Sequence, residues 1–225
     1  MSPMKSKVLD ALEISTDSSP DASIIWLHGL GADGHDFAPV VKELRLPIPI
    51  RFILPHAPLL AVTINGGHQM PAWYDIASGE ITALQDEAGI RNSQAEIERI
   101  ILQEISRGIA SHRILLAGFS QGGAVVLQTG LRYRDRLGGI IALSTYLPLV
   151  STLDTESSPS NASTPIFMAH GNQDRMIPIE KAYASRDLLT SRGYPLAWHE
   201  YAMAHGVCDK EITDIRNFIL TTLTS

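Results

Sequence analysis

The sequence predicts an α/β fold with a mostly parallel central sheet and helices on both faces, and three observations support this prediction. Short apolar runs that suit buried strands alternate with helical patterns along the whole chain. Hydrophobic residues make up 44% of the 225 residues, which is enough for a full core. Neither an internal repeat nor a break in composition divides the chain. We therefore expect a single domain over residues 1–225, without a separate lid domain.

Each predicted strand is a short run of mostly apolar residues bounded by polar residues, glycine or proline. Strands of a parallel sheet are covered on both faces, so their sequences tend to be continuously apolar rather than alternating. The runs of this kind occupy residues 24–27, 50–54, 114–117, 138–143, 165–169 and 196–201.

Apolar residues at helical spacing predict helices over 37–44, 86–108, 180–191 and 207–220, with a further helix directly after Ser120. Between these elements, residues 55–86 form a long irregular stretch with many aromatic and apolar side chains. An irregular segment of this length inside a compact domain is usually functional. Residues 151–164 are rich in serine and threonine, which predicts a surface loop.

The sequence Gly118-Phe119-Ser120-Gln121-Gly122 matches the pattern G-x-S-x-G between a predicted strand and a predicted helix. In that context the pattern forms the nucleophile elbow of α/β-hydrolases, a sharp turn that exposes the serine hydroxyl at the edge of the sheet. The turn requires small neighbours, and the glycines provide them. The competing interpretation is a strand–helix turn with an incidental serine. We take Ser120 as the nucleophile.

A serine hydroxyl needs a histidine to accept its proton, and on this fold the histidine follows the acid in the sequence. Three histidines follow Ser120. His199 lies within a predicted strand, and His170 precedes the best candidate acid. His205 lies in a loop just past the last strand and is the predicted base.

The acid is expected in a loop past the strand at 165–169, where Asp174 lies. Asp154, in the polar loop after another strand, is the weaker candidate, and Asp187 falls within a predicted helix. A turn residue or helix cap is the competing interpretation of Asp174.

The oxyanion of an acyl-transfer reaction needs two backbone N–H donors. One is the N–H of Gln121, at the start of the helix after Ser120. The other is expected from the glycine-rich loop His28-Gly29-Leu30-Gly31, and we assign it to the N–H of Leu30. His28 is then expected to brace that loop.

Two apolar segments follow strand ends and are expected to form the wall of an open acyl-binding groove. Leu60 and Trp73 belong to the first segment, and Leu147 belongs to the second. The competing interpretation is that these side chains are ordinary core residues.

Neither a metal nor a cofactor is predicted, because the other histidines lack the i, i+4 pairing of a helical zinc site; they are His35, His56, His68 and His112. A formal charge of −6 argues against nucleic-acid binding. No apolar run approaches the ~18 residues of a membrane span, so stable membrane insertion is not expected. A single cysteine, Cys208, and the lack of a signal peptide predict a cytoplasmic location.

Beyond the elbow, the chain from residue 24 onward resembles the family of small α/β-hydrolases that contains carboxylesterases, acyl-protein thioesterases and lysophospholipases. The stretches that carry the resemblance are 27–31, 54–58, 71–76, 86–90, 118–123, 147–149, 170–171 and Asp174. The resemblance implies a triad of Ser120, Asp174 and His205 with oxyanion donors at Leu30 and Gln121. Gly206, which follows the histidine, looks closer to the bacterial carboxylesterase branch than to eukaryotic thioesterases.

The family resemblance also implies the reaction, which is hydrolysis of short to medium acyl esters, with thioesters or lysophospholipids as further substrates. It suggests a homodimer, since some relatives are dimers. Two alternatives are considered: a catalytically silent binding protein with this fold, and a thioesterase that acts on lipidated proteins.

Overall fold

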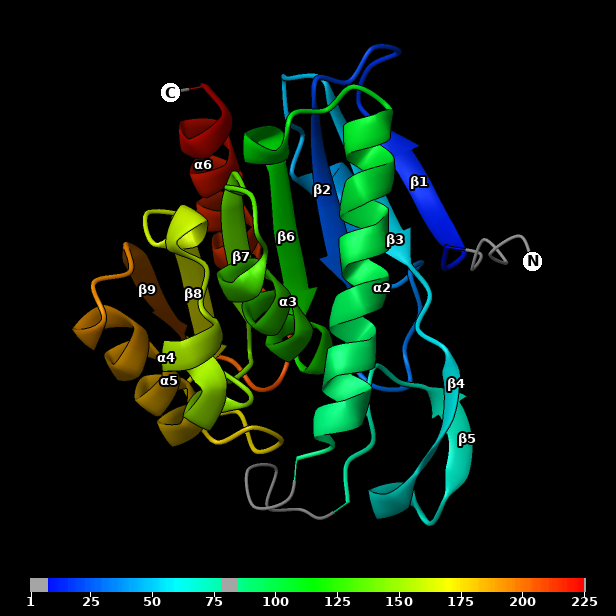
Figure 1. Ribbon diagram of the computed structural model, residues 1–225, viewed down its shortest axis with the longest axis vertical. Helices are drawn as coiled ribbons and strands as arrows, with labels where there is room; N and C mark the ends of the chain where they lie inside the picture. The colour runs from blue at the N-terminus through cyan, green and yellow to red at the C-terminus, as the bar shows by residue number, and fades with distance from the viewer. Residues whose placement is uncertain (1–7, 78–84, 225) are drawn as a thin grey trace.

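The computed structural model describes residues 8–77 and 85–224, and its centre is a seven-stranded sheet in the order β1-β3-β2-β6-β7-β8-β9 (Figure 1). All neighbouring strands run parallel except β1, which pairs antiparallel with β3 at the edge. The prediction of a mostly parallel central sheet is therefore confirmed. The strands are β1 (Ala11–Ser15), β2 (Ala22–Leu27), β3 (Ile50–Pro55), β6 (Ile114–Phe119), β7 (Gly139–Leu143), β8 (Ile166–Gly171) and β9 (Leu196–Tyr201).

Helices cover both faces of the sheet, as predicted (Figure 1). One face packs against α2 (Glu87–Ser106), α3 (Gln121–Arg132), α4 (Leu153–Glu156) and α5 (Ile179–Ser191). The other face packs against α1 (Ala38–Glu43) and α6 (Asp209–Thr224). The central strands β2 and β7 are buried along their whole length, and β6 is buried except at its last residue, Phe119. This accounts for their continuously apolar sequences.

The structure differs from the predicted element list in three places. Strand β1 is an edge strand within the polar stretch before residue 22, and its half-buried sequence lacks a continuous apolar run. The stretch 55–86 contains an antiparallel hairpin of β4 (Leu59–Val62) and β5 (His68–Pro71), while residues 78–84 lie outside the described residues. The predicted surface loop at 151–164 contains helix α4 and short 3₁₀ turns.

Because the strands are parallel, the loops that follow β2, β6, β8 and β9 meet at one edge of the sheet. These loops carry the predicted oxyanion donor, the predicted nucleophile, the predicted acid and the predicted base, in that order. Over the described ranges, no helix combines the length and apolarity that crossing a membrane requires.

Candidate active site

Ser120 occupies a strained turn between β6 and α3. Its φ angle is +55°, a conformation that non-glycine residues rarely adopt and that costs on the order of 1–3 kcal/mol. The turn is possible because its neighbours are small: a Cβ on Gly122 would lie 2.6 Å from the carbonyl oxygens of Leu27 and His28. Ser120 begins helix α3 without capping it through its side chain, which leaves the hydroxyl available for chemistry.

His205 and Asp174 form a hydrogen-bonded pair across the loops that follow β9 and β8. His205 Nδ1 lies 2.6 Å from Asp174 Oδ2, and the Asp174 side chain is fully buried. The other carboxylate oxygen, Oδ1, accepts the backbone N–H groups of Met176 at 2.8 Å and Ile177 at 3.0 Å. A carboxylate with these partners accepts the Nδ1 proton of His205, which leaves Nε2 unprotonated and able to act as a base.

The predicted nucleophile and the predicted base share one cavity. Ser120 and His205 both line it, and the ring centroids of Phe119 and His205 are 4.7 Å apart. The strand ends thus bring together Ser120, Asp174 and His205, which are at least 31 positions apart from one another in the sequence.

The other acid and histidines considered from the sequence do not border this cavity. Asp154 forms a two-pronged ion pair with Arg192 at an exposed site. His199 stacks on Phe167 with ring centroids 4.6 Å apart. His170 is fully buried behind Asp174: its Nε2 lies 2.8 Å from the carbonyl oxygen of Ile177 and 3.3 Å from Asp174 Oδ2. None of these residues lines the cavity that contains Ser120.

The glycine-rich loop after β2 lies beside the nucleophile. A Cβ on Gly29 would be 3.4 Å from Ser120 Cβ, and Leu30 lines the same cavity. His28 braces the loop, with Nδ1 2.8 Å from the carbonyl oxygen of Gly29 and Nε2 accepting the Ala57 N–H at 3.1 Å. Burial lowers the pKa of His28, so its ring is neutral in this role.

Gln121 connects the nucleophile turn to the segment after β5. Its side-chain oxygen accepts the backbone N–H of Trp73 at 2.8 Å, and its side-chain NH₂ donates to the carbonyl oxygen of Tyr74 at 2.7 Å. These bonds fix the start of helix α3, where the backbone N–H of Gln121 is located.

The cavity has a volume of about 750 Å³ and is bordered mainly by apolar side chains. A volume of this size is typical of sites for small organic ligands. The apolar wall includes Val40, Ile64, Met70, Ile76, Met176 and Val207. Two tyrosines add polar atoms: the hydroxyls of Tyr74 and Tyr146 are 2.9 Å apart, and burial raises the pKa of Tyr146 to about 12, so it stays neutral.

The structure corrects the prediction of which residues form the acyl wall. Leu60, Trp73 and Leu147 do not border the cavity. Trp73 is 1% exposed and donates its indole N–H to the carbonyl oxygen of His28 at 2.8 Å, so it anchors the glycine-rich loop from below. Leu147 is a core residue, and Leu60 lies on the β4–β5 hairpin. The alternative interpretation as core holds for Trp73 and Leu147.

Several cavity residues were not predicted from the sequence, because the segments that carry them show no pattern typical of a binding site. Val40 lies on the short helix α1, whereas Met176 and Val207 lie in the loops that carry Asp174 and His205. Met176 lies two residues after the predicted acid, and Val207 lies two residues after the predicted base. This closeness in the sequence was the signal that could have identified them.

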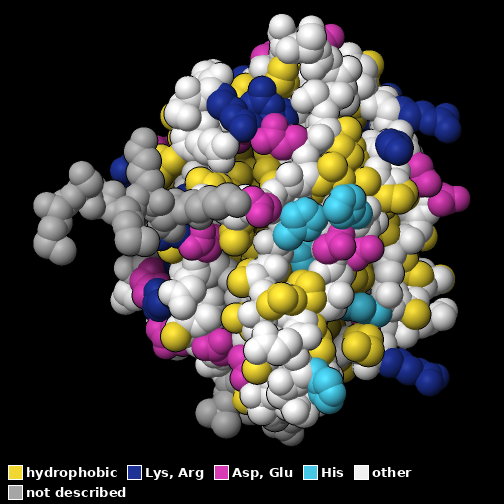
Figure 2. Space-filling model, turned by 90° about the vertical axis from the view of Figure 1, so that its right-hand side faces the viewer, with side chains coloured by type: hydrophobic (Ala, Val, Ile, Leu, Met, Phe, Trp, Pro, Cys, Tyr) yellow, Lys and Arg dark blue, Asp and Glu magenta, His cyan; other side chains and the backbone are white. Residues whose placement is uncertain are grey.

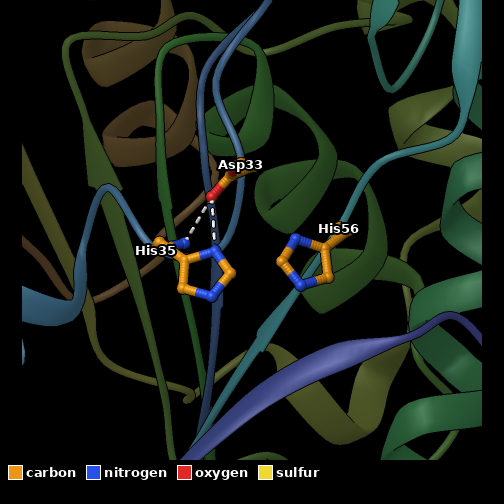
Figure 3. A group of neighbouring side chains, drawn as sticks. All are labelled: Asp33, His35 and His56. Atoms are coloured by element: carbon orange, nitrogen blue, oxygen red, sulfur yellow. Dashed lines mark hydrogen bonds and ion pairs between the residues drawn. The ribbon is translucent and has the colours of Figure 1, made fainter.

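Two of the remaining histidines, which have no i, i+4 pairing in the sequence, nevertheless lie close together in the structure. His35 and His56 lie near each other and near Asp33, with one potential ligand atom from each within 4.8 Å of the others (Figure 3). All three residues lie in loops or at a strand end, where helical spacing is no guide to proximity.

Comparison with known proteins gives the family of the chain. The model of the phospholipase/carboxylesterase family matches residues 10–223. An acyl-protein thioesterase 1 of Neurospora crassa is 43% identical over 214 residues, which cover 90% of this chain and 87% of the relative. An acyl-protein thioesterase 1 of Gibberella zeae is 38% identical over 227 residues, which cover 96% of this chain and 97% of the relative.

The fold also has close counterparts among solved structures. The crystal structure of Arabidopsis thaliana SOBER1 superposes with a TM-score of 0.85 at 30% identity, covering 90% of this chain and 99% of that one. The fungal origin of the two thioesterases does not favour the bacterial branch suggested by Gly206. The elbow, the buried pair behind it and the match over nearly the whole length lead to one conclusion: the chain belongs to the phospholipase/carboxylesterase family of α/β-hydrolases.

Proposed function

We propose that this serine hydrolase cleaves esters and thioesters of medium-length acyl chains through an acyl-enzyme on Ser120. In the first half-reaction, Ser120 Oγ attacks the acyl carbonyl carbon while His205 Nε2 takes the hydroxyl proton. His205 then gives this proton to the leaving alcohol or thiol. In the second half-reaction, His205 deprotonates a water molecule that attacks the acyl-enzyme, and the proton returns to Ser120 as the carboxylic acid leaves.

The observation that carries this proposal is the 2.6 Å bond between His205 and the buried Asp174, in the cavity that also contains the strained Ser120. When His205 accepts a proton, the carboxylate stabilises the resulting imidazolium. Asp174 itself is held by two backbone N–H groups, so it cannot turn away from His205.

The developing oxyanion is stabilised by the backbone N–H groups of Leu30 and Gln121. Both residues border the cavity on either side of Ser120. Gln121 is the first residue of helix α3, where N–H groups have no partner within the helix and attract negative charge. Removing a single donor of this kind typically costs ~10²-fold or more in kcat.

The acyl chain occupies the apolar part of the cavity, between helix α1 and the β4–β5 hairpin. Val40, Met70 and Ile76 border this region. Each buried methylene contributes up to ~0.8 kcal/mol, so kcat/KM should rise from acetyl towards medium chains and level off once the cavity is filled.

The test is a series of p-nitrophenyl esters from acetyl to dodecanoyl, used below their micelle concentrations, with matching thioesters. Val40→Asp should remove most of the gain with chain length while sparing acetyl hydrolysis. Leu102→Asp is the matched control, because Leu102 is 44% exposed on helix α2 and does not border the cavity. A wild type that prefers acetyl, or a Val40→Asp variant that loses all chain lengths equally, would contradict the acyl assignment.

Covalent labelling tests the nucleophile independently of the substrate. A fluorophosphonate should modify Ser120, and Ser120→Ala should lose both the label and several orders of magnitude in kcat while keeping its fold. Ser191→Ala, at an exposed helix end, is the control. A wild type that takes up no label would favour the catalytically silent binding protein.

One observation favours lysophospholipids as a second class of substrate. Arg175 borders the cavity next to Met176 and is exposed, and in the described parts of the chain it has no acidic partner within ion-pair distance. Its guanidinium suits the phosphate of a lysophospholipid leaving group. Arg175→Gln should lower kcat/KM for a lysophospholipid and leave a neutral ester of the same acyl chain unchanged; equal effects on both would exclude this role.

The homodimer and the cytoplasmic location remain predictions. Size-exclusion chromatography with light scattering would test the first, and imaging of a tagged protein in its own host would test the second.

A further inference from the structure

A second group of reactive side chains lies on the outer side of the loop that carries Leu30. Asp33 and His35 belong to the loop between β2 and α1, and His56 follows the last residue of β3. Figure 3 shows the Asp33 carboxylate directed at His35, with the His35 and His56 rings side by side. The ring centroids are 5.3 Å apart. None of the three residues borders the catalytic cavity.

Gly34 is the reason that the loop and the strand end lie so close together. A Cβ at this position would be 2.3 Å from the carbonyl oxygen of Leu54, so only glycine allows the loop to rest directly on β3. The backbone N–H of Gly34 also donates to His56 Nδ1 at 3.2 Å. The contact therefore places the residues on either side of Gly34 next to His56.

The Asp33 side chain is already oriented by the loop. Its Oδ1 accepts the backbone N–H of His35 at 2.7 Å and contacts the His35 Nδ1 at 2.9 Å. These two contacts hold the carboxylate of Asp33 beside the imidazole of His35. The backbone N–H of Asp33 in turn donates to Asp36 Oδ2 at 3.0 Å.

The charge around the group favours a cation. Asp33 and Asp36 carry negative charge, and within residues 8–77 and 85–224 neither forms an ion pair with a lysine or arginine. Figure 2 shows histidine side chains beside acidic ones on this face, surrounded mainly by hydrophobic and uncharged surface. A divalent cation would supply the missing positive charge.

We propose that Asp33, His35 and His56 bind a divalent zinc ion, or a similar late first-row metal ion. Two imidazoles and one carboxylate are donors that such ions prefer, whereas Mg²⁺ and Ca²⁺ select oxygen ligands. Ligands at about 2.1 Å from a tetrahedral zinc ion lie roughly 3.4 Å apart. The three donor atoms lie within 4.8 Å of one another, so they must move slightly closer together to bind the ion.

The exposed side chain of His35 can make this adjustment, because it is 66% exposed and turns without disturbing the core. The hydrogen bond from Gly34 to His56 is long at 3.2 Å, so it is the weakest of the bonds that ligation would exchange. Water would complete the coordination, as it does at sites with three protein ligands.

The bound ion would tie the loop between β2 and α1 to the end of β3. That loop also carries Leu30, the proposed oxyanion donor, on its inner side. The ion has no part in the acyl transfer itself, since its ligands do not border the cavity. Its role is to stabilise the folded loop, because a ligand that binds only the folded chain raises the melting temperature.

Isothermal titration calorimetry with ZnCl₂ tests the site on wild-type protein that has been treated with a chelator and desalted. We expect one zinc ion per chain and a melting temperature that rises with zinc and then saturates. His35→Ala and His56→Ala should each weaken zinc binding about 10-fold or more. His68→Ala is the matched control, because His68 is an exposed histidine on the β4–β5 hairpin outside the group.

His205→Ala separates the proposed site from the catalytic residues, which also present imidazole and carboxylate groups. This variant should bind zinc as the wild type does. The proposal is overturned if His205→Ala loses zinc binding while His35→Ala keeps it, or if the wild type binds no zinc. Because His35 is largely exposed, circular dichroism of His35→Ala should match the wild type, so that a loss of binding reports on the site.

Discussion

Replacing Asp174 by asparagine tests the catalytic pair most directly, because the structure determines how the new amide must lie. Asp174 Oδ1 accepts two backbone N–H groups, from Met176 and Ile177. An asparagine can satisfy both donors only by placing its oxygen there. Its NH₂ group then faces His205 Nδ1, where the carboxylate oxygen Oδ2 is now 2.6 Å away. Two donors would meet at this contact unless the ring changes its tautomer.

The tautomer with a bare Nδ1 relieves that conflict and carries its proton on Nε2. In this form His205 cannot accept the proton of Ser120, and the negative charge that stabilises the imidazolium is also lost. We expect kcat/KM to fall by about 10⁴-fold, which corresponds to roughly 5 kcal/mol of transition-state stabilisation. The opposite amide orientation would point the NH₂ group at two backbone donors inside a buried site, at a cost of ~1–3 kcal/mol for each unsatisfied group.

The assay is hydrolysis of a medium-chain p-nitrophenyl ester, with a thermal melt to verify folding. Asp154→Asn is the matched control, because Asp154 is exposed and pairs with Arg192 outside the cavity. It should change kcat/KM by no more than about 2-fold, as surface ion pairs contribute little. The reasoning is refuted if Asp174→Asn keeps a tenth of the wild-type kcat/KM, or if Asp154→Asn is the more damaging of the two.

Three further predictions concern a glycine beside the His205 loop, the indole of Trp73 and a buried carboxyl group on helix α6. Gly171→Ala would place a Cβ 2.3 Å from the carbonyl oxygen of Met203, which should displace the His205 loop and lower kcat more than 10-fold. Gly206→Ala is the control, because the space around its Cβ is open, and it should change kcat little. Equal kcat values for the two variants would contradict this prediction. Trp73→Phe leaves the buried His28 carbonyl without its indole donor and should destabilise the fold by ~1–3 kcal/mol, measured by urea unfolding; an unchanged midpoint would count against the anchor. Burial raises the pKa of Glu211 from 4.5 to about 8, so between these pH values the folded chain holds a proton that the unfolded chain releases. The free energy of unfolding should therefore fall as the pH rises from about 4.5 to 8, by up to ~5 kcal/mol. Glu211→Gln should flatten this decline in urea titrations across that range, and a slope equal to that of the wild type would disprove the assignment.

The chemistry of the site could be predicted because it depends on short motifs and on chain order. Ser120 is recognisable from five consecutive residues between a strand and a helix. Parallel strands bring the loops after them to one edge, so Asp174 and His205 could be found as the acid and the histidine that follow in the required order. The structure places these residues together as expected, with a bond between the last two.

Side-chain direction could not be predicted in the segment 55–76. Trp73 and Leu60 were expected in the acyl wall because they are apolar and lie after a strand end. Which apolar side chains border the cavity depends on how the β4–β5 hairpin lies beside the loop after β2, where the Gly31 N–H donates to the Pro71 carbonyl oxygen, and on the hydrogen bond of the Trp73 indole. Apolar residues form both cores and binding pockets, so their composition does not separate the two.

The central sheet and the helices on its faces could be predicted from the sequence, and so could the candidate triad of Ser120, Asp174 and His205. Hydrophobic periodicity is local, and motif order follows from parallel topology. The wall of the cavity and the proximity of His56 to Asp33 and His35 became visible only in the folded chain. That meeting depends on Gly34 resting on the carbonyl oxygen of Leu54, a contact between segments about 20 residues apart. The spacing of residues along the chain does not encode such a contact, because loops have no fixed period and their positions are set by the backbone against which they pack.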